Sequence, residues 1–307
     1  METVLISGGT GMIGSEIAQA LLGKGYRVII LTRKLPHKNT LNENLAYALW
    51  NLREKTIDEE AIKSADHILH LAGEGIADKR WTAKRKQQIV ESRVKSGELL
   101  VEALKTIPHK VRTFTSAAAT GWYGPDPVIP NPSPFIETSH SSDDFLGQTC
   151  RAWEASVQPV QALGIKLTIF RQGIVLSNKG GAIKRFKLPV RFGLATILGT
   201  GRQVISWIHI DDLVRLYINS IEKKSFSGIY NAVSPQPVSN KNFMLTLARK
   251  IKGRFFIPIY IPAFLLKLIY GELSIEVLKS VTVSSQKLKD AGFTFQYPSI
   301  DSALGSA

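Results

Sequence analysis

The feature that most constrains the fold is a glycine-rich segment close to the N-terminus. Gly8, Gly11 and Gly14 form the pattern G-x-x-G-x-x-G between an apolar run and a stretch whose apolar residues recur every four positions. In such a strand–turn–helix unit the glycines permit a tight turn, close approach of a pyrophosphate and close packing of helix on sheet. The helix N-terminus adds oriented N–H donors. A dinucleotide site is therefore predicted, with a ligand-free turn as the alternative, and its residues are Gly8, Gly11, Met12, Ile13 and Gly14.

Short apolar runs alternate with longer helical patterns through the first two thirds of the chain. Runs of this kind are typical of strands that are buried on both faces of a parallel sheet. Short links between strands and helices imply right-handed crossovers. The sequence therefore predicts an α/β fold of the Rossmann type, a doubly wound parallel sheet. The predicted strands are Thr3–Ser7, Tyr26–Thr32, Asp66–Leu71, Val111–Ser116 and Lys166–Arg171.

The alternation of strands and helices fades after about residue 235. We therefore expect a cofactor-binding domain over residues 1–235 and a small, mostly helical C-terminal lobe over residues 236–307, which would hold substrate or act as a lid. Leu176–Gly201 is rich in Gly, Lys and Arg and lacks a clean period. We expect this segment to form a flap over a ligand cleft.

The charge balance is compatible with a nucleic-acid partner, an anionic membrane surface or a phosphorylated ligand, and does not decide between them. The chain has 39 lysine and arginine residues against 25 acidic ones, a net charge of +14. The basic residues look scattered, and the densest group, Lys79–Lys86, is expected on a helix running from about Trp81 to Lys105, as a solvated face or a basic docking surface. No recognised nucleic-acid motif accompanies the charge, so we expect no nucleic-acid partner. The single cysteine, Cys150, excludes an intramolecular disulfide and a Cys-rich zinc site, and we predict no metal site.

The sequence predicts neither a secretory signal nor a membrane span. The N-terminus enters an apolar strand at once, without the charged and apolar regions of a signal peptide. The most apolar stretch, Phe255–Ile269, is interrupted by Pro258, Pro262 and Lys267 and is too short to span a bilayer. We expect a buried piece of the C-terminal lobe, with attachment to a membrane surface as the alternative. The expected location is the cytoplasm.

The end of the second predicted strand favours NADP(H) over NAD(H). An NAD-binding protein normally carries an acidic residue about 20 residues after the glycines, where it binds the ribose 2′-hydroxyl. This chain has Arg33 there, 19 residues beyond Gly14. A guanidinium suits a 2′-phosphate, although an exposed Arg-Lys pair without a ligand is the alternative. The residues predicted on this side of the cofactor are Thr32, Arg33 and Lys34.

Ordered matches along essentially the whole chain resemble the extended short-chain dehydrogenase/reductases. They follow an atypical branch known as epimerase-like or cell-division-inhibitor-like proteins. The matching motifs are Gly8–Gly14, His70–Glu74, Arg80-Trp81, Ser92–Val94, Gly121–Gly124, Trp153-Glu154, Arg171–Leu176, Trp207–Asp212 and Ala291–Phe293. The resemblance implies that Leu71, Ala72 and Gly73 pass along the adenosine half of the cofactor, and that Arg93 reaches it from the next helix. It also implies that Thr115 and Ser116 close the fifth predicted strand beside the nicotinamide.

The catalytic pattern of that family is broken in this chain. Active members use a Ser or Thr, and a Tyr and Lys spaced Y-x-x-x-K, in which the Lys lowers the pKa of the Tyr. The matching helix here carries Cys150 and Glu154, and Ala118 stands where relatives carry a second hydroxyl. Three substitutes remain open: Ser116 as a hydrogen-bond donor, Tyr123 facing the nicotinamide, or a reactive Cys150. Each has a structural alternative, and Glu154 is a candidate acceptor for the cofactor ribose.

Other candidate groups are three arginines and a short acidic turn. Arg171, Arg191 and Arg202 are candidates for holding an anionic substrate, with ordinary surface arginines as the alternative. His209–Asp212 is expected to cap a helix through an Asp.

Two functions follow from these patterns. The first is an NADP(H)-binding oxidoreductase or nucleoside-diphosphate-sugar-epimerase-like enzyme that lacks the standard triad and uses Ser116 or Tyr123. The second is a non-catalytic, NADP(H)-bound regulator that acts through protein partners, as the cell-division name of the branch suggests. A homo-oligomer is compatible with either, and the substrate is expected to be a small molecule, with an anionic compound as one candidate.

Overall fold

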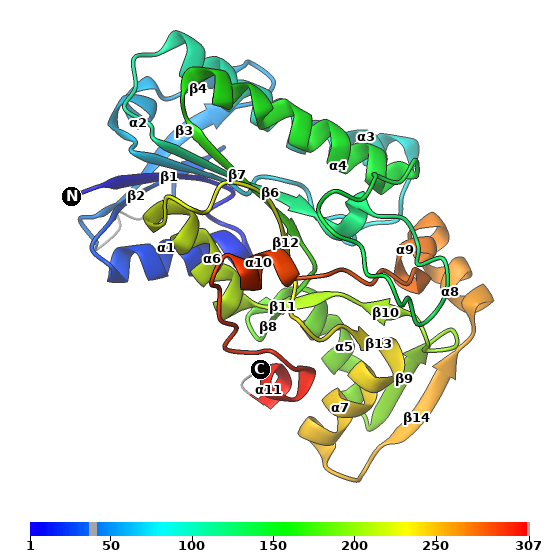
Figure 1. Ribbon diagram of the computed structural model, residues 1–307. Coiled ribbons are helices and arrows are strands. Elements are labelled where there is room, and N and C mark those ends of the chain that lie inside the picture. Colours follow the sequence, from blue (N-terminus) through cyan, green and yellow to red (C-terminus); the bar gives the residue numbers. More distant parts are fainter. Residues whose placement is uncertain (37–41, 306–307) are drawn as a thin grey trace.

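An eight-stranded sheet lies at the centre of the computed structural model, which describes residues 1–36 and 42–305. Its strand order is β12-β7-β6-β5-β1-β2-β3-β4, and each neighbouring pair is parallel except β3 and β4 (Figure 1). The strands are β1 (Thr3–Ser7), β2 (Arg27–Thr32), β3 (Leu45–Asn51), β4 (Thr56–Ile57), β5 (His67–His70), β6 (Thr113–Ala119), β7 (Lys166–Gln172) and β12 (Gly228–Ala232).

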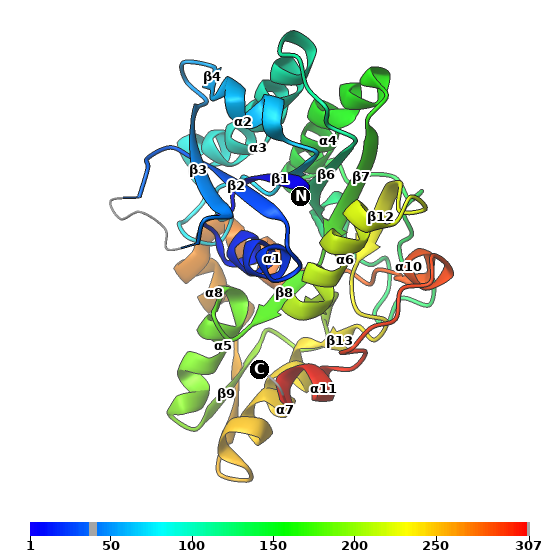
Figure 2. The same ribbon diagram turned by 90° about the vertical axis from the view of Figure 1, so that its left-hand side faces the viewer.

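Helices cover both faces of this sheet, as a doubly wound fold requires. Figure 1 shows α1 and α6 below the sheet and α3 and α4 above it, and Figure 2 views α1 nearly end-on. The helices of the first face are α1 (Met12–Gly23), α6 (Ile210–Glu222) and α10 (Gln286–Asp290). Those of the second face are α2 (Glu59–Ser64), α3 (Ala83–Thr106) and α4 (Phe145–Val157), followed by the 3-10 turn η2 (Gln158–Leu163).

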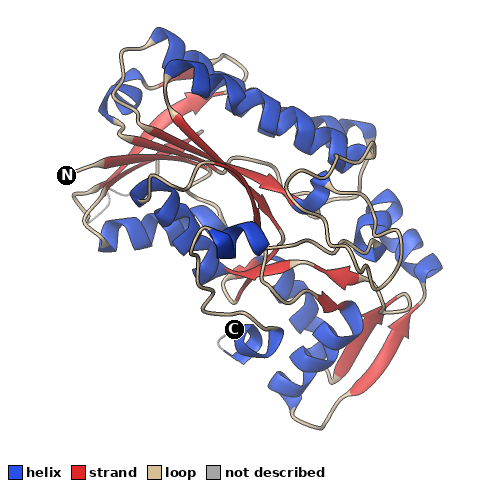
Figure 3. Ribbon diagram, in the orientation of Figure 1, coloured by secondary structure: helices blue, strands red, loops and turns tan. Residues whose placement is uncertain are grey.

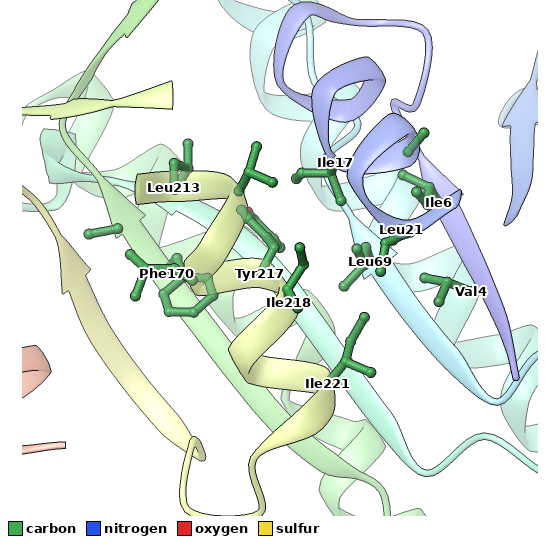
Figure 4. Close-up of a cluster of buried hydrophobic side chains, with 14 of the residues drawn as sticks. Val4, Ile6, Ile17, Leu21, Leu69, Phe170, Leu213, Tyr217, Ile218 and Ile221 are labelled. Atoms are coloured by element: carbon green, nitrogen blue, oxygen red, sulfur yellow. The ribbon is translucent and has the colours of Figure 1, made fainter. Parts of the chain in front are cut away.

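The two faces are held by separate apolar cores, because successive side chains of a strand point to opposite sides. Val4 and Ile6 of β1 belong to the core under α1 and α6, whereas Leu5 belongs to the core under α2, α3 and α4. Figure 4 shows Ile17 of α1 and Tyr217 of α6 in the first of these cores. Burying each such side chain stabilises the fold by about 1.5–3 kcal/mol.

The predicted Rossmann-type architecture is confirmed, with changes at particular elements. Strand β3 was not predicted, and only two of its seven residues are buried, so the sequence lacks the continuous apolar run of a central strand there. Strand β6 continues to Ala119, three residues past its predicted end. Helix α3 begins at Ala83, because Thr82 accepts a hydrogen bond from the Arg85 amide and caps it.

A second lobe packs below the carboxyl ends of the central strands. Its core draws on both sides of residue 235, joining Leu176, Ile183 and Trp207 to Phe243 and Leu247. Its elements are β8 (Ile174–Ser177), α5 (Gly181–Arg191), β9 (Leu194–Leu198), β10 (Val204–Ile205), β11 (Trp207–His209), β13 (Val238–Ser239), α7 (Asn240–Lys252), β14 (Ile257–Ile261), α8 (Ala263–Tyr270), η3 (Gly271–Leu273), α9 (Ser274–Leu278) and α11 (Ile300–Gly305). Residues 306 and 307 of the expected lobe lie outside the described residues.

The expected flap, residues 176–201, consists largely of regular structure. It contains the end of β8, the whole of α5 and the whole of β9, and its apolar residues enter the core of the second lobe. The turn at Gly180 and Gly181 borders the start of α1, because a Cβ on Gly181 would lie 3.2 Å from the Met12 side chain. Figure 3 shows the two strands β9 and β14 as a separate pair at the lower right.

The expectation for residues 255–269 was wrong. They form β14 and most of α8, and most of their side chains are exposed. Within the described ranges, 1–36 and 42–305, none of the helices combines the length and the apolar character that crossing a membrane demands.

Candidate functional site

A cavity of about 300 Å³ opens at the carboxyl ends of the central strands. It lies where the strand order reverses between β1 and β5, the place at which open α/β sheets bind their ligands. The lining comes from the β1–α1 turn, the ends of β5, β6 and β7, and residues of α3 and α4. The lining residues are Gly8, Gly11, Met12, Ile13, Gly14, Leu71, Gly73, Arg93, Ala117, Ala118, Ala119, Trp153, Gln172 and Gly173.

The glycine turn is built so that only glycine fits at two of its positions. Gly8 has a φ of +74°, and a Cβ there would lie 2.7 Å from the Leu71 carbonyl carbon. A Cβ on Gly14 would lie 2.3 Å from the Gly8 carbonyl oxygen. Helix α1 begins at Met12 behind Gly11, so no side chain caps its first-turn N–H groups. These groups can therefore receive an anion at the helix N-terminus.

The adenosine side of the predicted site carries an exposed cation. Arg33 follows β2 with 82% of its side chain exposed, and its Nη1 lies 3.9 Å from the Glu74 carboxylate. Such an exposed pair contributes little stability, so Arg33 can exchange it for a phosphate at low cost. The Thr32 hydroxyl is already used locally, because it donates to the Lys34 carbonyl at 2.9 Å. Of the three residues after β5, Leu71 and Gly73 line the cavity, whereas Ala72 contributes its backbone beside the glycine turn.

Arg93 of α3 brings a positive charge to the cavity. Its Nη1 donates to the Ile89 carbonyl at 3.0 Å, and its guanidinium carbon lies 5.0 Å from the centre of the Trp153 ring. A Cβ on Gly73 would lie 3.1 Å from that guanidinium carbon, so the glycine makes room for the side chain. Burial lowers the pKa of Arg93, because it removes the charged group from water. A desolvated guanidinium beside a cavity fits a negatively charged ligand group.

The structure places Thr115 and Ser116 inside β6, away from the cavity. The Thr115 hydroxyl is within 2.8 Å of the Ser220 hydroxyl of α6, and the Ser116 hydroxyl donates to the Ala117 carbonyl at 3.0 Å. Both side chains are buried. The three alanines after Ser116 extend the strand, so it is Ala117, Ala118 and Ala119 that reach the cavity. Ser116 is therefore not retained as a candidate catalytic group.

Tyr123 is a buried packing residue in this structure. It follows the 3-10 turn η1 (Thr120–Trp122), its hydroxyl donates to Asn231 Oδ1 at 2.6 Å, and its ring stacks on Phe135 at 5.2 Å. Burial raises the pKa of Tyr123 to about 12. The side chain does not line the cavity. Because its hydroxyl can neither reach a ligand in the cavity nor ionise readily, Tyr123 is not a candidate catalytic group either.

The positions of the family's tyrosine and lysine are used structurally. Both carboxylate oxygens of Glu154 accept hydrogen bonds from Arg171, at 2.7 and 2.9 Å, and both residues are buried. Burial raises the pKa of Glu154, and the Arg171 guanidinium opposes that rise. Glu154 is thus occupied and is not available to a cofactor ribose, and Arg171 is not available to a substrate. Cys150 is buried too, and burial raises the pKa of its thiol to about 12, so it is no nucleophile.

The other candidate groups also lie outside the cavity. Arg191 and Arg202 are exposed, and Arg202 donates to the Ile129 carbonyl at 3.3 Å. The cap of α6 is His209 and not an Asp, because the His209 ring accepts from the Asp211 amide. In the basic group 79–86, Arg85 is buried and paired with Glu74 at 3.1 Å, so this segment is not a uniformly solvated face.

Several lining residues were not predicted as site residues. They are Ala117, Ala118, Ala119, Trp153, Gln172 and Gly173. A usable signal existed for all of them except Trp153, because the carboxyl ends of neighbouring parallel strands meet at one edge, and β7 ends at Gln172, just before Gly173, beside β6. For Trp153 the only signal was its place next to Glu154 in a family motif.

Comparisons with known proteins agree with this geometry. The model of the NAD dependent epimerase/dehydratase family matches residues 4–232, and a domain of unknown function named DUF1731 matches residues 261–307. An epimerase family protein of Staphylococcus saprophyticus is 35% identical over 304 residues, covering 99% of this chain and 98% of that protein. The epimerase family protein YfhF of Bacillus subtilis is 33% identical, covering 98% and 96%.

A solved structure extends the likeness to three dimensions. The crystal structure of the human epimerase family protein SDR39U1 with NADPH has a TM-score of 0.86 and 27% identity, covering 99% of this chain and 98% of that one. The family match spans most of the chain, and the relatives match along nearly their whole length. The chain therefore belongs to the NAD dependent epimerase/dehydratase family.

Proposed function

We propose that this protein binds NADP(H) at the glycine turn and uses it for hydride transfer to or from a small anionic substrate. The observation that carries the proposal is the cradle at Gly8 and Gly14, where any Cβ would meet main-chain atoms at 2.7 and 2.3 Å. A turn so tight, followed by a helix whose N-terminus has no side-chain cap, fits a pyrophosphate. Arg33 and Lys34 would bind the 2′-phosphate, and Leu71, Ala72 and Gly73 would follow the adenosine half. The human relative's complex with NADPH supports this choice of cofactor.

The bound nicotinamide would supply or accept a hydride at its C4. Among the cavity-lining residues, all of which belong to the described part of the chain, Arg93 is the one with a charged side chain. A guanidinium keeps its protons, so Arg93 would hold and stabilise a negative substrate oxygen without acting as an acid. Trp153 would fix the plane of the guanidinium from behind.

A titration with two cofactors tests the cofactor assignment. Arg33→Asp replaces a charge-assisted contact to phosphate by repulsion, so the affinity for NADPH should fall by about tenfold or more. The affinity for NADH, which has no 2′-phosphate, should change little. Arg53→Asp, an exposed arginine in the turn between β3 and β4, is the matched control. Unchanged NADPH affinity in Arg33→Asp would contradict the proposal.

A second measurement tests the chemistry. Oxidation of NADPH should be followed with a panel of keto nucleotide sugars and other anionic carbonyl compounds, in the wild type, Arg93→Lys and Arg93→Met. We expect turnover to fall steeply in Arg93→Met, and Arg93→Lys to keep part of it because it keeps the charge. If no compound oxidises NADPH in the wild type, hydride transfer is the part of the proposal that fails.

The alternative is an NADP(H)-bound regulator without turnover. The observation that favours it concerns the positions of the family's catalytic lysine and tyrosine. Glu154, which pairs with the buried Arg171, stands at the lysine position, and the protonated thiol of Cys150 stands at the tyrosine position. A regulator should bind partners differently with and without cofactor. Pulldowns with NADPH present and absent discriminate, because identical partner lists would leave the enzyme as the better explanation.

A further inference from the structure

Large apolar side chains are left exposed mainly on the second lobe. Of the eighteen that are exposed in the described ranges, twelve lie between Leu188 and Ile275. The most exposed of these twelve are Phe255 at 88%, Phe192 at 78% and Phe264 at 74%. Isolated exposed apolar residues are ordinary, but a contiguous group marks an interaction surface.

These residues form one strip because β14 leads directly into α8. We define the apolar strip as residues 255–270 together with Phe192. Phe192 lies at the start of the strip, because the Ile257 amide donates to the Gly193 carbonyl at 2.8 Å and β14 then runs parallel to β9. Figure 1 shows β14 and α8 along the right-hand rim of the molecule, with the turn before β14 at its lowest point.

The local structure explains why the strip is not buried. Ala195 and Ile197 of β9 point into the core under α5 and α7, whereas Ile257 and Ile259 of β14 pair with the intervening residues of β9 and remain 65% and 36% exposed. In α8, Leu266 is the buried residue, and Phe264 and Leu268, one turn apart, are 74% and 71% exposed.

The positive charge of the protein is concentrated in the lobe that carries this strip, which corrects the expectation of scattered basic residues. The two segments that build most of the lobe, 173–205 and 238–271, contain twelve lysine and arginine residues and no acidic residue. They therefore supply twelve of the fourteen net positive charges. Among the described residues only two of the twelve, Lys179 and Arg185, form ion pairs. Arg191 and Arg254 directly precede Phe192 and Phe255 in the sequence.

The charge decides which partner fits the apolar strip. A second copy docked by two-fold symmetry would bring the same cations face to face, which is unfavourable. Nucleic acid would satisfy the cations and leave the apolar side chains exposed. An anionic bilayer satisfies both, because its phosphates pair with the basic residues while aromatic side chains insert at the boundary of headgroups and acyl chains.

We propose that the apolar strip and its basic surround, which is the set of lysine and arginine residues in segments 173–205 and 238–271, attach the protein peripherally to an anionic phospholipid bilayer. Phe192 and Phe255 are the side chains that insert. None of the strip residues lines the cofactor cavity. The attachment is therefore independent of the proposed cofactor, and either proposal can fail without the other.

Co-sedimentation of the full chain with vesicles tests the attachment. One set of vesicles is phosphatidylcholine alone, and the other contains about one-third phosphatidylglycerol. We expect binding to the anionic vesicles only, falling as salt is raised to about 0.5 M. The double variant Phe192→Ser/Phe255→Ser should bind at least about tenfold more weakly.

Two further variants separate insertion from charge and from misfolding. Arg191→Glu/Arg254→Glu should weaken binding to anionic vesicles by at least about twenty-five-fold, at roughly fivefold for each basic residue removed. The matched control is Leu49→Ser/Val128→Ser, which removes apolar side chains that are 47% and 55% exposed outside the strip, and it should bind like the wild type. Thermal unfolding should be unchanged in the phenylalanine variant, because both rings are already in water.

Three outcomes would overturn the proposal. The first is equal binding to the two kinds of vesicle, or binding to neither. The second is wild-type self-association in sedimentation velocity that the phenylalanine variant abolishes, which would assign the strip to a second copy. The third is release of the protein from vesicles by a stoichiometric amount of duplex DNA, which would assign the basic surround to nucleic acid.

Discussion

Replacing Glu154 by glutamine removes one charge from a pair that is almost completely shielded from water. Arg171 is 1% exposed and Glu154 is 3% exposed, and two hydrogen bonds of 2.7 and 2.9 Å join them. Arg171 also donates to the Glu137 carbonyl at 2.9 Å and to the Tyr123 hydroxyl at 3.1 Å, and it lies 3.6 Å from the centre of the Trp122 ring. Glutamine keeps the shape of the side chain and leaves the guanidinium without a counter-charge.

The expected cost is about 3–5 kcal/mol in the free energy of unfolding, the usual result of breaking a buried ion pair from one side. Removing both charges, in Glu154→Leu/Arg171→Met, should cost clearly less than the sum of the two single changes. It should not be neutral, because the Glu137 carbonyl and the Tyr123 hydroxyl each lose a donor, at about 1–3 kcal/mol for a buried group left unpaired. A double-mutant cycle should therefore give a coupling energy of more than about 1 kcal/mol.

Equilibrium unfolding in urea measures these differences, and Glu91→Gln is the control. Glu91 pairs with Lys95 on the exposed face of α3, so its replacement should cost at most about 0.5 kcal/mol. In the same samples the affinity of folded Glu154→Gln for NADPH should equal that of the wild type, because both carboxylate oxygens face Arg171. A loss of less than about 1 kcal/mol in Glu154→Gln, or a large fall in its NADPH affinity, would refute the reasoning.

Three further predictions concern buried groups near the site. Burial lowers the pKa of His70 to about 4, so between that value and the ordinary 6.5 the unfolded chain binds a proton that the folded chain does not. The free energy of unfolding should therefore fall by about 3 kcal/mol as the pH drops through this window. Urea unfolding at a series of pH values measures this fall, which His70→Gln should flatten. Cys150, the single cysteine, should resist a thiol reagent in the native protein and react fully in urea, and rapid native labelling would show that the thiol is accessible. Gly14→Ala places a Cβ 2.3 Å from the Gly8 carbonyl oxygen, so it should lower the free energy of unfolding by about 1–3 kcal/mol and weaken NADPH binding. In the control Gly23→Ala the new Cβ meets no atom within 4 Å, so neither quantity should change.

The parts of the site that follow from local sequence could be predicted. The turn from β1 to α1 depends on residues a few positions apart, and the glycine spacing specifies it. The end of β2 at Thr32 was likewise visible as the end of an apolar run. The structure places Gly8 and Gly14 at the cavity in a turn that leaves no space for a side chain, as the glycine spacing predicted, whereas Gly73 was expected there only from the family resemblance.

The rest depended on contacts between distant residues. The predicted end of β6 at Ser116 was three residues early, because alanine carries no strong strand signal, and this shift removed Ser116 from the cavity. The direction of the Tyr123 side chain is fixed by Asn231, which is 108 positions away. The exposed strip and its charge could not be recognised either, since segments 173–205 and 238–271 become neighbours only in the folded lobe.

The path of the chain between the two lobes has a mechanical consequence. The backbone passes from one lobe to the other after β7, before α6, after β12, before α10 and again before α11. Rotation of one lobe against the other would require all five connections to bend at once, so a single hinge is not enough. We therefore expect the width of the cleft to be set when the chain folds and to differ little between the free protein and a ligand-bound form.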